Sequence, residues 1–360
     1  MPAEFQRPKR VRLVDIAEKA GVSRRAVSAV LLGTGGDRVS VGEDKAVKIR
    51  ELAKSMGYRP NNAARQLVGK RSNTYGLLVA SAGDPLRSFL IQHLDAEAVK
   101  LGNRTLIANT VVAPDRFEKS YEEFSNSGVD GVLCAVHAWL PGDREKLLQM
   151  HPTTVFYENP GIANAAYATV DREAAIYQAT THLIERGRQR IGLALMKKDR
   201  PQQKARIRGY KRALADHGRK YSAQLFYSPP AKQPLAIATH QQDLFTWHFP
   251  EQVIDEMIEA LVIRGSADAI IAFDDYWAAV LIKLLRRRGV RVPDDVAVIG
   301  YLNHYLADFL DPPLTTIDLS HQVAAREMVQ MLEKMITTGE LPAEERIATI
   351  EPRLIVREST

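Results

Sequence analysis

From Thr74 onward, short apolar segments alternate with amphipathic ones, and this alternation limits the possible folds more than any other feature of the chain. Each apolar segment is followed by a stretch with helical periodicity. Continuous apolar strands separated by helices are typical of a parallel sheet that helices cover on both faces. The strand candidates are residues 74–80, 104–110, 130–136, 153–158, 190–196, 269–273 and 296–301.

The number of strand candidates is too large for one half-domain of this kind. At 360 residues the chain is also long enough for two or three compact units. We therefore expect two similar α/β lobes, with parallel sheets and a ligand cleft between them. In such sheets ligands bind beyond the carboxyl ends of the strands, so polar residues that follow the strands are the candidates for ligand contacts.

Charge is distributed unevenly along the chain. Residues 1–72 contain 16 Lys and Arg against 7 Asp and Glu, which leaves 33 of the 49 basic and 36 of the 43 acidic residues for the remainder. A small basic unit thus precedes a large, mildly acidic one. This asymmetry indicates a unit that binds a polyanion, attached to a body with a different task.

Several classes of protein are disfavoured by the composition. No apolar run approaches the roughly 18–20 residues that cross a bilayer, so no membrane association is expected. The first residues are charged and lack an export signal, which predicts a cytoplasmic protein. Cys134 is the single cysteine, and the nine histidines are scattered without a metal-binding or catalytic pattern. We expect no cofactor, no metal and no catalysis; the alternative is an enzyme or a free-standing binding protein with the same two-lobed shape.

The basic unit begins with a helix, a tight turn and a second helix. Apolar residues from Leu13 to Ala20 share one helical face, Gly21 interrupts it, and Ser23 can cap the next helix. Arg24 and Arg25 follow in the first turn, where cations oppose the helix dipole. This placement is explained if that end of the helix meets DNA, because recognition helices present their first residues to base edges. The alternative is an ordinary helical bundle with solvated arginines.

The stretch "YRPNNAARQLVGKRS", residues 58–72, contains a second candidate for DNA contact. A helix over residues 62–68 is too short to be stable alone, since about 12–15 residues are needed in water. If two copies pack together in a minor groove, Leu67 can insert between base steps while nearby arginines face phosphates. A flexible linker between domains is the alternative.

Three motifs in order, "DIAEKAGVS", "AVS" and "GYRPNNAARQL", resemble the LacI/GalR family of transcriptional regulators, and the similarity continues almost to the end of the chain. The resemblance implies a helix-turn-helix DNA-binding domain (1–60), a hinge helix and linker (61–73), and a two-lobed, periplasmic-binding-protein-like domain (74–360) for effector binding and dimerisation. It further implies a homodimer that reads a pseudo-palindromic operator in double-stranded DNA, usually as a repressor, under the control of a sugar or sugar derivative bound between the lobes.

The resemblance also implies which residues contact DNA. Two departures from the family pattern, Ala29 and Leu32 in the second helix, leave base recognition more dependent on the two arginines before them. The implied DNA contacts are Leu13, Ser23, Arg24, Arg25, Ser28, Tyr58, Asn61, Ala64, Arg65 and Leu67.

For the effector, the positions of residues after the predicted strands and the resemblance together indicate contacts at Asp84, Arg206, Trp247, Asp274, Asp275 and Asn303. Arg206 lies in the "R-x-x-G" element, and Asp274 replaces the Asn of the family's "A-N-D" motif. Capping of the following helix is the alternative for Asp275. Leu302 replaces an Asp that often binds a sugar hydroxyl in the family. Because leucine accepts no hydrogen bond, a buried hydroxyl facing it would lose roughly 1–3 kcal/mol. The usual mode of sugar binding is therefore not expected here.

Overall fold

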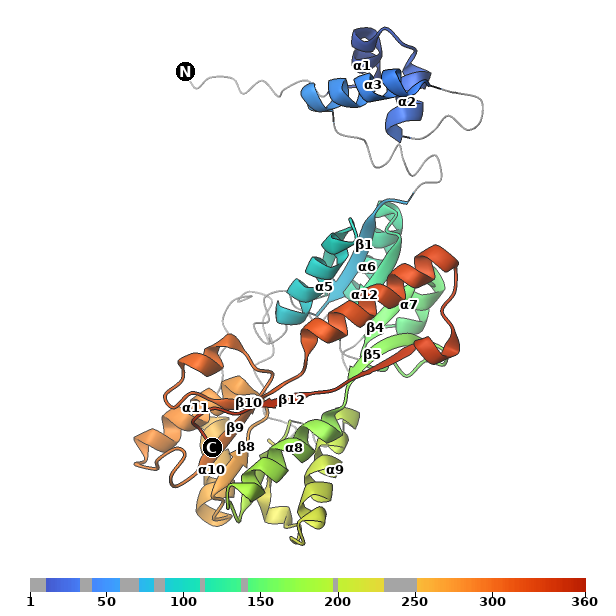
Figure 1. Ribbon diagram of the computed structural model, residues 1–360. Helices are drawn as coiled ribbons and strands as arrows, with labels where there is room; N and C mark the ends of the chain where they lie inside the picture. The colour runs from blue at the N-terminus through green and yellow to red at the C-terminus, as the bar shows by residue number, and fades with distance from the viewer. Residues whose placement is uncertain are drawn as a thin grey trace. The chain divides into compact units, whose positions relative to one another are not determined.

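The computed structural model describes residues 11–32, 41–58, 71–80, 88–110, 114–136, 142–196, 200–229 and 251–360. The chain divides into two compact units, Met1–Thr74 and Tyr75–Thr360 (Figure 1). The first contains only helices in its described part, and the second contains two sheets. No helix among the described residues has the length and apolarity needed to cross a membrane.

Three helices form the small unit: α1 (Leu13–Ala20), α2 (Arg24–Leu32) and α3 (Glu43–Ser55). Gly21 ends α1 in the left-handed conformation (φ 68°), which makes the sharp turn toward α2 possible without a steric penalty. Ile16, from α1, is fully buried, and so are one residue of α2 and one of α3. Each helix therefore contributes one apolar face to a common small core.

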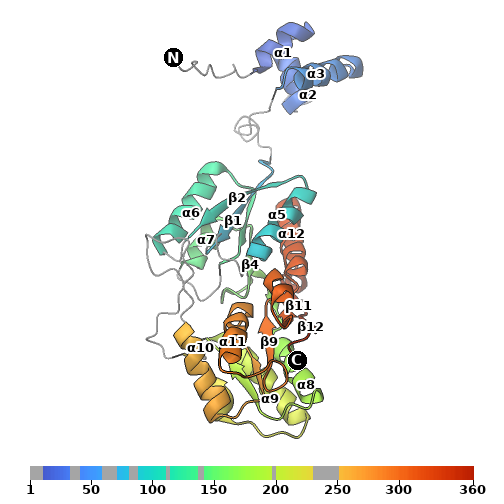
Figure 2. The same cartoon turned by 90° about the vertical axis from the view of Figure 1, so that its left-hand side faces the viewer.

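The first lobe of the large unit has a six-stranded sheet in the order β11-β5-β4-β3-β1-β2. Apolar side chains on one face of this sheet pack against α5 and α12, and those on the other face pack against α6 and α7 (Figure 2). The elements are β1 (Thr74–Val79), α5 (Ser88–Lys100), β2 (Arg104–Asn109), α6 (Pro114–Ser127), β3 (Gly131–Cys134), α7 (Arg144–Met150), β4 (Thr154–Tyr157), β5 (Ala166–Val170), α12 (His321–Thr338) and β11 (Ile347–Ile350).

The second lobe repeats this plan with the strand order β12-β10-β9-β8-β6-β7. Strand β12 runs antiparallel to β10, whereas β9 runs parallel to it. The elements are α8 (Arg172–Glu185), β6 (Ile191–Ala194), α9 (Pro201–Asp216), β7 (Phe226–Tyr227), α10 (Glu251–Ile258), the π-helical turn η3 (Glu259–Arg264), β8 (Ala269–Ile271), α11 (Asp275–Arg287), β9 (Ala297–Tyr301), η4 (Tyr305–Phe309), β10 (Thr315–Asp318) and β12 (Arg353–Ile355).

In the order of the described elements, the chain crosses between the lobes three times: from β5 to α8, from β10 to α12 and from β11 to β12. The predicted pair of parallel α/β lobes is therefore confirmed. All seven predicted strands are present, but β2 is not covered on both faces as predicted. It is an edge strand, and Leu106 and Ile107 are exposed on it.

Candidate functional site

The start of α2 presents two cations in the small unit. Ser23 caps the helix as predicted, because its Oγ accepts a hydrogen bond from the N–H of Ala26 at 3.1 Å. Arg24 and Arg25 follow and are both exposed. Neither guanidinium has a hydrogen-bond or ion-pair partner among the described residues. Two cations at the positive end of a helix dipole destabilise the helix. Binding of an anionic partner such as a nucleic acid would offset this repulsion.

The other predicted DNA contacts differ in their surroundings. Leu13 and Tyr58 are half-buried and pack against the core of the small unit, so each also has a structural role. Ser28 lies half-buried one turn after Arg24 and Arg25. The remaining predicted contacts, Asn61, Ala64, Arg65 and Leu67, lie outside the described residues.

Arg206 occupies an aromatic site in the second lobe. Its side chain is 5% exposed, and its guanidinium lies 3.7 Å from the ring centroid of Tyr301 and 4.9 Å from that of Phe273. One terminal nitrogen donates to the carbonyl oxygen of Phe273 at 2.9 Å. Burial lowers the pKa of Arg206. Its Nε is buried without an acceptor among the described residues, which leaves one strong donor for a ligand.

Asp274 follows this aromatic site directly and caps α11. Its Oδ1 accepts a hydrogen bond from the N–H of Trp277 at 2.8 Å, and the side chain is 3% exposed. Burial raises its pKa to about 7. The alternative considered for Asp275, helix capping, is wrong, because Asp274 occupies the capping position.

Asp275 is fully buried and holds the turn that follows β9. One carboxylate oxygen accepts from the N–H of His304 at 2.6 Å, and the other accepts from the hydroxyl of Thr316 at 2.5 Å. Burial raises the pKa of Asp275 to about 6, whereas these donors favour the charged form. A Cβ at Gly300 would lie 2.2 Å from the same carboxylate, so only glycine fits there. Since both oxygens are occupied by protein donors, Asp275 positions the turn.

A buried ion pair that the sequence did not indicate joins the lobes. Arg172, at the start of α8, pairs with Glu158, which follows β4, and both side chains are almost completely buried. Gln202 of α9 donates to the second oxygen of Glu158 at 3.1 Å. Burial opposes the charge of Arg172, but Glu158 beside it raises the pKa of the guanidinium. The only sequence signal for this ion pair was the position of Glu158 at the carboxyl end of a predicted strand. Its partner, Arg172, comes from the other lobe.

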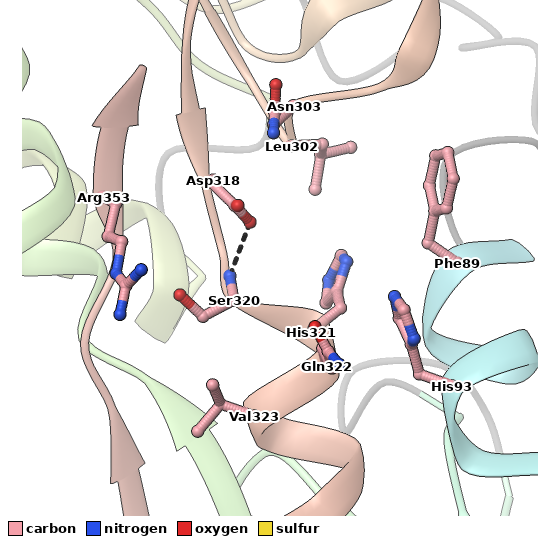
Figure 3. A pocket seen from close by; sticks show the side chains of 10 residues that line it. All are labelled: Phe89, His93, Leu302, Asn303, Asp318, Ser320, His321, Gln322, Val323 and Arg353. Carbon is pink, nitrogen blue, oxygen red and sulfur yellow. Dashed lines mark hydrogen bonds between the residues drawn. The ribbon is translucent and has the colours of Figure 1, made fainter. Parts of the chain in front are cut away.

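The structure separates the predicted effector residues into two places. Arg206 contacts the ring and carbonyl oxygen of Phe273, and Asp274 follows Phe273 in the chain. Asn303 instead accepts from Arg357 at 3.1 Å and lines a cavity with Leu302 (Figure 3). The other two predicted contacts, Asp84 and Trp247, lie outside the described residues. No group of three or more potential metal ligands occurs in the described part of the chain.

A two-lobed body with a polar, aromatic site and a helix-turn-helix unit with exposed arginines define a class of protein, the ligand-responsive DNA-binding regulators. A family model for a periplasmic binding protein-like domain matches residues 180–360. The transcriptional regulator CelR of Thermobifida fusca is 30% identical in an alignment that covers 99% of this chain and all of CelR. The regulator DegA of Bacillus subtilis is 27% identical, with 97% of each chain covered.

Solved structures agree with these relatives. A complex of CelR with cellobiose matches with a TM-score of 0.67 and 26% identity, over 98% of this chain and 100% of that one. The Lac repressor dimer bound to operator and the anti-inducer ONPF matches with a TM-score of 0.76 over 98% and 99% of the two chains; at 19% identity it shows the fold alone. The chain belongs to the LacI/GalR family of helix-turn-helix transcriptional regulators. It is a DNA-binding regulator with an effector-binding body, and its relatives are regulators, not enzymes.

Proposed function

We propose that the chain is a cytoplasmic repressor that binds a pseudo-palindromic operator as a homodimer and responds to a small molecule, a sugar or sugar derivative, bound between its lobes. The observation that best supports sequence-specific binding is the pair Arg24–Arg25 at the start of a capped α2, whose guanidinium groups have no partner among the described residues. Arginine at this position of a recognition helix can bind guanine edges in the major groove. In this proposal residues 1–60 bind the operator, and residues 61–73 form the hinge.

Exposed apolar side chains support the dimer. Leu106 and Ile107 of β2 lie beside α5, which ends near the exposed Val99. In the second lobe, Tyr305 and Phe309 of η4 are 63% and 82% exposed. Apolar surfaces of this kind on both lobes are typical of protein interfaces. A dimer that buries them would present two recognition helices to two operator half-sites.

The effector proposal rests on Arg206 and its aromatic surroundings. Its Nε, which has no acceptor among the described residues, can donate to a ligand oxygen, and aromatic rings are suited to the apolar face of a sugar ring. The complex of the relative CelR with cellobiose supports a sugar class. Leu302, where the family usually has an acceptor, indicates that this ligand is bound with a different set of polar contacts.

Selection of binding sites from random DNA tests the operator proposal. The wild-type protein should select a two-fold symmetric sequence, because a dimer presents two equivalent helices. Arg25→Ala should lose preference at one position in each half-site, at a cost of about 1–3 kcal/mol. Lys54→Ala, which removes a cation from the last turn of α3, is the matched control and should leave the selected sequence unchanged. An asymmetric motif, or the same motif for Arg25→Ala, would contradict the proposal.

A further inference from the structure

Helix α9 and the residues that follow it form a basic segment in an otherwise acidic body. Residues 201–220 contain seven Lys and Arg and one Asp, whereas the rest of residues 73–360 contains 26 Lys and Arg against 35 Asp and Glu. Of these seven cations, only Arg206 belongs to the aromatic site described above. A local excess of this kind creates a positive potential that attracts polyanions.

Four of these cations share one side of α9, which packs beside α8 in the second lobe (Figure 1). We call this side the α9 basic face; its members are Lys204, Arg208, Lys211 and Arg212, and each is exposed. They recur at intervals of three and four residues, so their side chains project from the same side of the helix. At a rise of about 1.5 Å per residue, the face extends over roughly 12 Å.

Neighbouring carboxylates neutralise the α9 basic face only in part. Glu173 of α8 accepts hydrogen bonds from Arg208 and from Arg212, one with each carboxylate oxygen and each at 2.8 Å. Lys204 and Lys211 form no ion pair with a described residue. Four cations and one carboxylate leave an excess of positive charge for an external anion.

Tyrosine rings hold two of the cations in place. The Nζ of Lys211 lies 4.4 Å from the ring centroid of Tyr221, and the guanidinium of Arg212 lies 4.5 Å from that of Tyr177. Tyr221 packs in turn against Phe226, with the ring centroids 5.1 Å apart. Such contacts restrict long side chains before binding, so less conformational entropy is lost when an anion binds.

The composition of the α9 basic face favours duplex DNA over other polyanions. Protein interfaces are apolar at their centre and depleted in Lys, but Tyr221 is the only exposed large apolar side chain among the described residues 200–229. Single strands are bound by stacking of bases on aromatic rings, whereas cations already contact the rings of Tyr177 and Tyr221. A row of cations of this kind is suited to the phosphates of a duplex.

We propose that the α9 basic face binds the phosphate backbone of a second duplex while the helix-turn-helix unit holds the operator. The face belongs to the large unit, whereas Arg24 and Arg25 belong to the small one. The exposed apolar side chains that support the dimer lie on β2, α5 and η4, so α9 remains accessible in the dimer. Phosphate contacts carry no sequence information, and the second duplex can therefore have any sequence. The regulator would thereby connect two DNA segments.

Surface plasmon resonance on the full-length protein tests the proposal. The selected operator is immobilised and saturated with protein, and a duplex of about 30 base pairs without the operator sequence is then passed over the complex. The wild-type complex should retain this second duplex at low salt and lose it steeply as salt rises. Lys204→Gln/Arg208→Gln/Lys211→Gln should weaken the retention at least about tenfold and reduce the slope of log affinity against log salt by about three.

A matched control removes three cations from α11 of the same lobe. Lys283, Arg286 and Arg287 are exposed, and each pairs with a carboxylate of Glu251 or Asp311. Lys283→Gln/Arg286→Gln/Arg287→Gln changes the net charge equally and should alter the retention by less than about twofold. Operator binding is measured first in every variant and should stay within about twofold of the wild type, because no substitution lies in the small unit.

Three results would overturn the proposal: no retention of the second duplex, equal retention by the α9 triple variant and the wild type, or tighter retention of a single strand of the same sequence. The last result would assign the face to single-stranded nucleic acid. Because operator binding and retention of the second duplex are measured in separate steps, a failure of the operator proposal is distinguishable from a failure of this one.

Discussion

At the scale of single residues, two adjacent carboxylates differ in what they do. Asp274 directly follows Phe273 of the aromatic site around Arg206 and caps α11, whereas Asp275 fixes the turn after β9 through hydrogen bonds. Adjacent positions at a strand end point in different directions, so sequence alone indicated two polar candidates but not their roles. Both are buried, and the pKa of each is raised by burial.

The raised pKa of Asp274 predicts that the protein loses stability as pH rises. The group titrates near 3.8 when unfolded and at about 7 when folded. The folded state therefore binds more protons between these values, and the free energy of unfolding falls as pH rises through them. Each unit of pKa difference corresponds to about 1.4 kcal/mol. Asp274→Asn retains a capping oxygen and should show a shallower fall between pH 4 and 7 in urea unfolding.

Asp295→Asn is the control for this experiment. Hydrogen bonds from Arg291 lower the pKa of Asp295 to about 2. The contribution of Asp295 to the free energy of unfolding is therefore lost only below pH 4. Its effect on the free energy of unfolding should be constant between pH 4 and 7. If the free energy of unfolding depends on pH in the same way in Asp274→Asn and in the wild-type protein, Asp274 is not the source of the fall.

At the scale of elements, the close packing of α8 and α9 positions Arg206. A Cβ at Gly209 would lie 2.1 Å from the carbonyl oxygen of Glu173 and 3.1 Å from the backbone nitrogen of Tyr177. The two helix backbones therefore touch at this glycine. One turn earlier on α9, Arg206 reaches its aromatic site. This explains the spacing of the "R-x-x-G" element in physical terms.

Gly209→Ala should separate the two helices and destabilise the protein by about 1–3 kcal/mol, the usual cost of overpacking. It should also weaken effector binding, because Arg206 moves with α9. Thermal unfolding and ligand titration measure the two effects. Gly42→Ala is the matched control, since a Cβ at that position would meet no atom of the described residues within 4 Å, apart from its chain neighbours, and its φ is ordinary. A melting temperature equal to that of the wild type would show that the helices do not touch there.

The sequence predicted most of the helices and strands of the fold but fewer residues of the candidate effector site. Apolar runs revealed the long core strands, but β7 has only two residues, and β11 has three of its four residues at least partly exposed. Such strands lack the apolar pattern that marks a buried one. Arg206 and Asp274 were found because they occupy local motifs. The pair of Glu158 and Arg172 was missed because its partners meet only when two lobes assemble.

At the scale of the whole molecule, an aromatic contact spans the lobes. Phe89 of α5 lies 5.3 Å from the ring of His304 and 6.1 Å from that of Tyr305. His304 is held in turn by Asp275, so the contact is anchored in the second lobe. Any change in the angle between the lobes must alter this contact.

Phe89→Ala should shift the lobes away from the arrangement seen here. An aromatic pair contributes about 0.5–1.5 kcal/mol, which changes a two-state population about two- to tenfold. Spin labels at Glu123→Cys in the first lobe and Asp216→Cys in the second, both exposed, would report a broader or displaced distance distribution.

Tyr221→Ala removes a ring contact made with Phe226 inside the second lobe and should leave the distribution unchanged. Identical distributions for Phe89→Ala and the wild type would mean that Phe89 does not restrain the lobes. Effector and operator affinities should change together in Phe89→Ala, because linked equilibria respond reciprocally.

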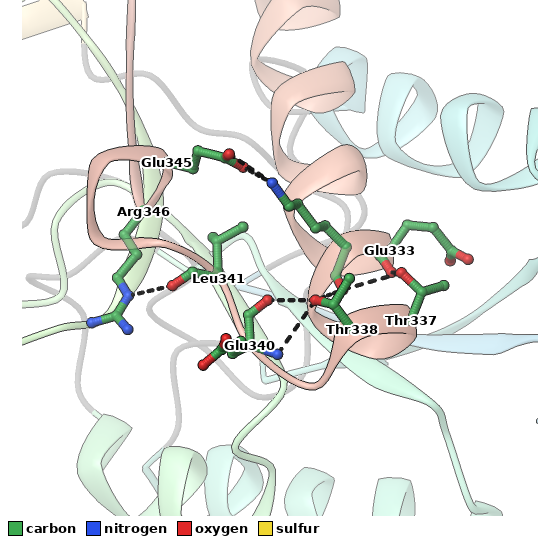
Figure 4. Close-up of polar contacts among 8 residues, drawn as sticks. Glu333, Thr337, Thr338, Glu340, Leu341, Glu345 and Arg346 are labelled. Carbon is green, nitrogen blue, oxygen red and sulfur yellow. Dashed lines mark hydrogen bonds and ion pairs between the residues drawn. The ribbon is translucent and has the colours of Figure 1, made fainter.

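The last crossing between the lobes begins from a well-fixed turn. Gly339 ends α12 with a φ of 83°, and Lys334 of that helix forms an ion pair with Glu345 at 2.5 Å. Arg346 donates to the carbonyl oxygen of Leu341 at 3.0 Å (Figure 4). These contacts direct the chain into β11, the edge strand of the first lobe, and then into β12 of the second.

This path sets an order of events on the ribosome. The first lobe takes α12 and β11 from residues 321–350, and the second lobe takes β12 from residues 353–355. Neither sheet can be completed until residue 355 has emerged, whereas the three helices of the small unit come from residues 13–55. Because chains are made from the amino end, the part with the exposed arginines is available to fold long before the body that would regulate it. Nascent chains must therefore keep two unfinished sheets from associating with other chains until β12 has emerged.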